Sequence, residues 1–78
     1  MIVEIITPDK IVFEGEANKV LLPGIDGWFE ILDHHAPLVS ILSAGEIKVT
    51  DAKKEEQLIP INGGVIEVND NHIKILAE

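Results

Sequence analysis

Side chains that bind metals or transfer protons gather in residues 27–38, the stretch GWFEILDHHAPL. Asp33, His34 and His35 are consecutive there, and with nearby carboxylates they supply the nitrogen and oxygen donors that zinc prefers. Adjacent residues of an extended chain point to opposite faces, so the two histidines are poorly placed to bind one ion. Helical i, i+4 spacing or a cysteine framework would favour zinc, and neither is present. We therefore expect no metal site in this stretch.

The nucleophiles of the chain are hydroxyl groups, because it contains no cysteine. They are Thr7, Ser40, Ser43 and Thr50. None lies in a nucleophile elbow or beside a histidine in sequence, so covalent catalysis is not indicated. The pair Gly63 and Gly64 precedes neither a helix start nor a P-loop lysine, and a tight turn with positive φ explains it better than a phosphate site. We expect no catalytic residue and no cofactor.

Length and composition indicate one compact acidic domain. The chain has 78 residues, 46% hydrophobic residues and a formal net charge of -8, and its basic residues are all lysines. The acidic excess disfavours nucleic acid and anionic lipid as direct partners, and no apolar run approaches the roughly 20 residues that span a bilayer. Basic or apolar protein surfaces remain as the favoured partners, so docking is the function class that composition supports.

Short stretches in which apolar and polar residues alternate predict the elements that position these side chains. Examples are VEI, IKV, VIEV and IKIL, and a period of two is typical of half-buried strands. Turn signals separate them at residues 7–9, 14–15, 23–24, 44–45, 51–54, 62–64 and 69–71. The pattern predicts an all-β, antiparallel β-sandwich of about nine to ten short strands over residues 1–78. Pro60 cannot donate to a strand ladder, so its strand is expected at a sheet edge or a bulge.

Trp28 and Phe29 admit a core role and a docking role. Consecutive strand residues face opposite sides, so one of the two is expected to face the core and the other to face out. The stretch PGIDGWF then predicts an exposed loop with an aromatic anchor, a composition typical of interface hot spots.

Four stretches in order resemble one known family. They are EIITPDKIVFEGEANKVLLPGIDG, HAPL at residues 35–38, GEIKV at residues 45–49, and the closing INGGVIEVNDNHIKILAE. Their order and spacing, over essentially the whole chain, resemble the sandwich domain of the epsilon subunit of F-type ATP synthases. The resemblance implies a ten-stranded sandwich in the central stalk, which contacts the gamma subunit with one surface and the c-ring with another.

The resemblance implies a non-catalytic rotor subunit that couples ion-driven rotation to ATP synthesis, peripheral on the cytoplasmic face of the bacterial inner membrane. Expected c-ring contacts are Ile25, Asp26, Gly27, Trp28, Phe29 and Glu30. Expected gamma contacts are Thr7, His35, Ala36, Pro37, Leu38 and Ser40. We expect these to form two adjoining docking surfaces, without direct membrane insertion.

Many members of this family continue into a two-helix domain that inhibits ATP hydrolysis and in some cases binds ATP. The sequence ends at Glu78, so we expect neither that inhibitory latch nor a nucleotide site. The alternative from another class is a lipoyl or biotinyl carrier domain, a sandwich of similar size with a modified lysine at a hairpin tip. Its candidate lysines are Lys10 and the pair Lys53 and Lys54, and an intact mass would show an adduct.

Overall fold

A computed structural model describes residues 1–78 as nine strands without a helix. The strands are β1 (Ile2–Ile6), β2 (Ile11–Glu16), β3 (Lys19–Gly24), β4 (Gly27–Leu32), β5 (Leu38–Leu42), β6 (Gly45–Thr50), β7 (Glu56–Ile61), β8 (Gly64–Asn69) and β9 (His72–Ala77). The number agrees with the predicted nine to ten. No helix in the structure has the length and apolar character needed to cross a membrane.

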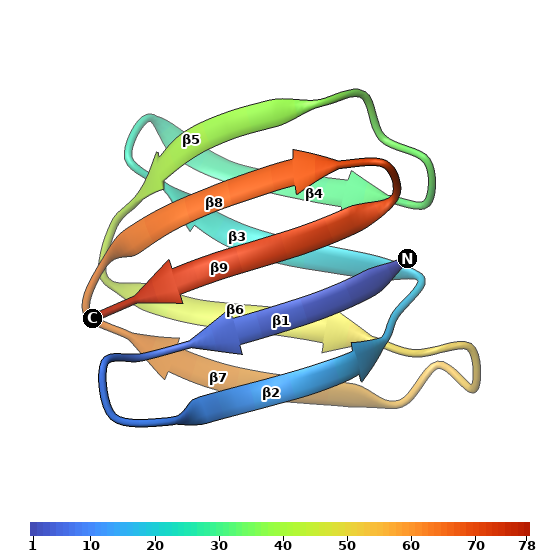
Figure 1. Ribbon diagram of the computed structural model, residues 1–78, viewed down its shortest axis with the longest axis horizontal. Coiled ribbons are helices and arrows are strands. Elements are labelled where there is room, and N and C mark those ends of the chain that lie inside the picture. Colours follow the sequence, from blue (N-terminus) through green and yellow to red (C-terminus); the bar gives the residue numbers. More distant parts are fainter.

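The strands form a curled sheet that packs as two layers (Figure 1). One layer has the order β2-β1-β9-β8-β5, and the other has the order β4-β3-β6-β7. The two meet where β3 pairs with β5 through Gly24 and Leu42 alone. Every pairing is antiparallel except that of β1 with β9, which is parallel, so the fold is a mostly antiparallel sandwich.

Strand alternation builds the core between the layers. In β8 and β9, for example, Ile66, Val68, Ile73 and Ile75 point inward, and charged or polar residues stand between them. Sixteen buried apolar residues form one cluster, and Thr50 is the only buried polar residue. Since the chain has no cysteine, this packing and the strand ladders stabilise the fold.

The sequence signals for edges and turns hold only in part. β7 ends the sheet order, which confirms the prediction that Pro60 lies on an edge strand. The predicted turn at residues 14–15 is wrong, because Gly15 lies inside β2 and pairs with Val3. β3 likewise continues through Gly24, and its turn falls at residues 25–26.

We predict that Ile75→Ala lowers the free energy of unfolding by about 2–5 kcal/mol, because it opens a cavity in a fully buried position. Val39→Ala is the matched control: Val39 is 70% exposed, and its truncation should change stability by less than about 0.5 kcal/mol. Urea denaturation followed by circular dichroism measures both. Equal effects would show that the layer interface is not the main source of stability.

Candidate docking surfaces

The hairpin of β3 and β4 ends in a tight two-residue turn made by Ile25 and Asp26. Gly24 and Gly27 flank this turn and pair with each other. A Cβ on Gly24 would lie 2.8 Å from the Phe29 ring, so the bare glycine lets that ring pack over the backbone. Gly27 has φ 130°, a conformation that favours glycine. The local sequence therefore fixes the shape of the tip.

Of the two roles that the sequence left open, Phe29 has the core role, and Trp28 has the exposed position that a docking role requires. Phe29 packs against the core cluster, whereas Trp28 is 61% exposed, which confirms that one faces in and the other out. Trp28 pairs with Pro23 on β3, and its ring reaches toward Gly45, where an added Cβ would meet Cη2 at 3.7 Å. The tip thus presents an indole that lies over Pro23 and Gly45, next to the exposed Ile25.

Hydrogen bonds tie the hairpin tip to the neighbouring layer. The Ile25 amide donates to the Ile41 carbonyl at 3.0 Å. The Ser43 amide donates to the Pro23 carbonyl at 2.8 Å, and the Ser43 hydroxyl donates to the same oxygen at 3.3 Å. The tip is therefore held against β5 and the turn that follows it.

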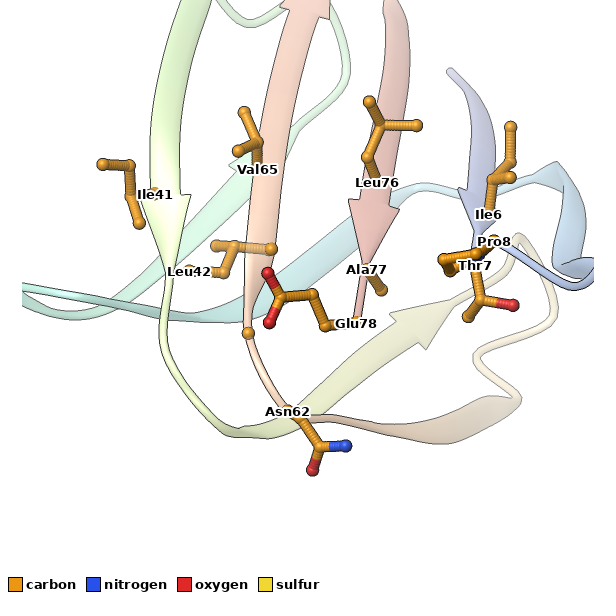
Figure 2. Close-up of a pocket in the computed structure, with 12 residues that line it drawn as sticks. Ile6, Thr7, Pro8, Ile41, Leu42, Asn62, Val65, Leu76, Ala77 and Glu78 are labelled. Atoms are coloured by element: carbon orange, nitrogen blue, oxygen red, sulfur yellow. The ribbon is translucent and has the colours of Figure 1, made fainter.

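An apolar strip crosses the outer face of the β2-β1-β9-β8-β5 layer at this same end of the sandwich. It consists of Ile41, Val65, Leu76 and Ile6, which are successive cross-strand partners on β5, β8, β9 and β1. Figure 2 shows the four side chains in a row. Ile41, Val65 and Leu76 are 43% to 55% exposed, and Ile6 is half-buried. Exposed apolar residues that adjoin in this way mark protein interaction sites.

The apolar strip lies in an open groove of about 730 Å³. Beyond it, at the end of the sandwich, Thr7, Pro8, Asn62 and Glu78 also line the groove. On its other side the next cross-strand row starts with Val39 on β5 and is charged from there on, with Glu67, Lys74 and Glu4 on β8, β9 and β1. From β8 to β1 the strip is thus one residue wide with polar groups along both sides, whereas on β5 the exposed Val39 adjoins it.

The sequence reasoning missed this strip, although the sequence carries a signal for it. In each of its strands the strip residue is next to a second apolar residue. The pairs are Ile5-Ile6, Ile41-Leu42, Val65-Ile66 and Ile75-Leu76. Since neighbouring strand residues face opposite sides, each doublet places one member in the core and one outside. Only the strand register shows that the outer members meet.

The structure separates the residues expected to contact gamma. Thr7 lines the groove, and its turn is closed by the Thr7 amide, which donates to the Lys10 carbonyl at 2.9 Å. His35, Ala36 and Pro37 are exposed in the β4–β5 connection at the opposite end, as Figure 1 shows. Because β4 runs the length of the sandwich, Trp28 and His35 do not adjoin as the sequence suggested.

The residues after His35 lie along β5. Ser40 is half-buried and pairs with the fully buried Ile66, so it stands on the inward side of the strand. Leu38 packs against the core. Val39 and Ile41 are the outward residues, and they connect the His35 end of the face with the apolar strip.

The histidines do not gather with acidic residues into a metal-binding group. His34 has φ 62°, so this segment is not the extended chain that the spacing argument assumed. Its amide donates to the Asn71 side-chain oxygen at 2.7 Å, and the His35 Nδ1 lies 2.7 Å from the Ala36 carbonyl. His72 Nε2 contacts Glu4 Oε1 at 2.8 Å, across the parallel pairing of β1 and β9.

Fold and site together define a small all-β sandwich domain with an exposed hairpin tip and an apolar strip on one outer face. The sequence model for the beta-sandwich domain of the ATP synthase Delta/Epsilon chain matches residues 1–78. The chain belongs to this family.

Three relatives illustrate the match, and each is an ATP synthase epsilon chain. The protein of Chlorobium limicola is 40% identical over 75 residues, which cover 96% of this chain and 85% of that one. The protein of Leptospira borgpetersenii is 41% identical over 76 residues, covering 97% and 59%. That of Gloeothece citriformis is 46% identical over 75 residues, covering 96% and 54%. The chain thus spans a little over half of the longer relatives.

Solved structures confirm the fold. A chain of the Euglena gracilis mitochondrial ATP synthase superposes with a TM-score of 0.92 at 22% identity, covering 99% of this chain and 49% of that one. A chain of the Tetrahymena thermophila mitochondrial ATP synthase, in a structure of its central stalk and c-ring, gives 0.78 at 20% identity, covering 97% and 61%. Membership of the epsilon family argues against the carrier-domain alternative.

We predict that acrylamide, a neutral quencher, quenches the fluorescence of Trp28, the only tryptophan, in the free chain, because its ring is largely exposed. Binding of a partner to the hairpin tip should protect the indole and lower the quenching constant. Stern–Volmer titration with and without the partner measures this. An indole already shielded in the free chain would contradict the placement of Trp28.

Proposed function

We propose that this chain is a central-stalk rotor subunit of ATP synthase, which docks gamma onto the c-ring and has no catalytic site of its own. In this role it couples ion-driven rotation of the ring to ATP synthesis, held peripherally at the cytoplasmic face of the bacterial inner membrane by its partners. Family membership supports the assignment. The observation that carries the docking role is the bond between the Ile25 amide and the Ile41 carbonyl, which joins the hairpin tip to the apolar strip.

The gamma subunit binds the outer face of the β2-β1-β9-β8-β5 layer. The apolar strip supplies the area whose burial stabilises the complex, and Thr7 lies at its margin. Val39 extends the contact toward His35 at the far end of β5. His35 and Pro37 act as peripheral contacts, whereas Ser40 supports β5 from its inward side.

The c-ring binds the hairpin tip. Ile25 and Trp28 give it exposed apolar surface, and Asp26 and Glu30 give it negative charge. Carboxylates at the rim of an interface steer association and fix register against basic residues of the ring loops. Asp33 contributes less to this field, because it pairs with the Met1 amine at 2.6 Å, at the other end of β4.

A rotor contact must transmit force without local unfolding. The two surfaces share a rigid base, because β3 pairs with β4 along its whole length, with β6 over its first half and with β5 at its end. Force on the tip reaches β5 through the Ile25 and Ser43 hydrogen bonds rather than through a flexible linker.

We predict that the chain forms a one-to-one complex with gamma from the same source, and that Leu76→Asp weakens it at least about 100-fold by placing a charge in the apolar contact. Leu58→Asp is the matched control, since Leu58 is 56% exposed against 53% for Leu76 but lies on the other layer. Calorimetry and native mass spectrometry measure affinity and stoichiometry. His35→Asp should have a smaller effect than Leu76→Asp. Equal losses for Leu76 and Leu58 would sink the assignment of the face.

We predict that Asp26→Asn with Glu30→Gln weakens association with detergent-purified c-ring at low salt, and that the difference fades near 0.5 M salt as the charges are screened. Glu55→Gln with Asp70→Asn removes two exposed charges at the opposite end of the sandwich and should leave association unchanged. Surface plasmon resonance across a salt series tests both. An unchanged salt dependence in the first variant means that these carboxylates do not face the ring.

A further inference from the structure

We infer that the part of gamma lying on the apolar strip is an amphipathic helix that crosses the strands, with basic residues beside its apolar stripe. This rests on the proposed docking of gamma to that face. It adds the secondary structure, the direction and the charge of the bound element.

The direction follows from the arrangement of the strip. Ile41, Val65, Leu76 and Ile6 come from four adjacent strands, so the strip runs across the strands rather than along them. Neighbouring strands lie about 4.8 Å apart, which makes the strip about 14 Å long. An element that covers it has to present apolar groups at a similar interval along its own axis.

A helix has this interval and a strand does not. The apolar stripe of a helix repeats at i+3 and i+4, which correspond to rises of about 4.5 and 6 Å. One face of a strand repeats about every 6.7 Å. A strand lying across β5, β8, β9 and β1 would also find no backbone partners, because their backbone groups pair within the layer.

The width of the strip admits one helical stripe. Turn residues Thr7, Pro8 and Asn62 bound it at the end of the sandwich. The charged residues Glu67, Lys74 and Glu4 bound it on the other side over β8, β9 and β1. A single ridge of helix side chains fits an open groove of about 730 Å³ between these borders. If gamma instead packed a sheet on this layer, the apolar side chains of that sheet would also cover the charged row, where they would be poorly matched.

The charges beside the strip determine the polarity of the flanks. Glu67, Glu4 and Glu14 lie in the adjacent cross-strand row, where Lys74 is the only cation. Glu78 adds a carboxylate on the other border of the groove. Lysine or arginine residues beside the apolar stripe of a helix complement both borders.

The outer face of the other layer lacks these features. Glu30, Leu21, Lys48 and Leu58 are successive residues of one row there, so charged and apolar side chains alternate. No continuous strip forms, and Lys48 pairs with Glu56 at 3.6 Å. The inference therefore concerns one face only.

Photo-crosslinking tests the secondary structure of the bound element. Benzoylphenylalanine replaces Ile41 in one variant and Ile6 in another, each variant is bound to purified gamma, and the crosslinked residues are mapped by mass spectrometry. A helix along the strip predicts capture sites about ten residues apart within one segment of gamma. A separation of about four residues indicates a strand, and capture in unrelated segments indicates a loop surface; either result overturns the inference. The same substitution at Leu58 is the control and should capture nothing.

Charge reversal tests the basic flanks. Glu67→Lys should weaken gamma binding roughly five- to tenfold at low salt. At high salt, the affinity of this variant for gamma should equal that of the unchanged chain. Glu46→Lys, an exposed change on the other layer, should leave affinity unchanged. Equal affinities for Glu67→Lys and the unchanged chain at low salt would show that the flanks of the bound element are not basic.

Two further outcomes separate this inference from the proposed function. If gamma binds and Leu76→Asp abolishes binding, but the crosslinks lack helical spacing, the helix is wrong and the docking face stands. If the unchanged chain does not bind gamma, the proposed function fails and the helix with it.

Light scattering on the free chain addresses self-association: a dimer that Ile41→Asp dissociates would assign the strip to a second copy and overturn the inference.

Discussion

The burial of one side of every strand in a single core constrains everything else in this protein. Sixteen apolar residues fill the space between two layers without help from disulfides, and Thr50 is the only buried polar residue besides them. A strand has only two faces, so each apolar residue beyond those the core needs must face out. The chain is rich in such residues, and the strand register decides whether they scatter or meet. On one layer they meet as the apolar strip; on the other they alternate with charges.

The corner between the layers has a second consequence. β3 carries the hairpin tip, and β5 carries one end of the apolar strip. These strands share only the pair Gly24 and Leu42, but the Ile25 and Ser43 hydrogen bonds extend the contact. The corner that closes the sandwich therefore also links the two candidate docking surfaces. A change there would disturb fold and docking together, whereas a change at Trp28 or Val65 would act on one surface alone.

Local patterns predicted the local features of this fold. Period-two alternation indicated the strands, Pro60 indicated an edge, and the adjacent aromatic residues indicated one inward and one outward side chain. Features that depend on pairing were beyond such patterns. Gly15 reads as a turn but is accommodated within β2 opposite Val3, and the parallel pairing of β1 with β9 joins segments at opposite ends of the sequence. The apolar strip needs that same long-range register, so its doublets are visible in the sequence but their meeting is not.

The separation of Trp28 from His35 changes how the stretch between them is understood. Although they are close in sequence, they lie at opposite ends of the sandwich because β4 runs between them. The end that carries both candidate docking surfaces is instead assembled from turns distant in sequence: the hairpin tip, Thr7 and the groove lining near Asn62. The chemistry of the two surfaces there differs, since the tip combines an indole with carboxylates and the strip is apolar between acidic borders. A charged tip favours a contact that forms and aligns quickly, whereas apolar burial favours one that dissociates slowly, so the strip is the better suited of the two to a permanent partner.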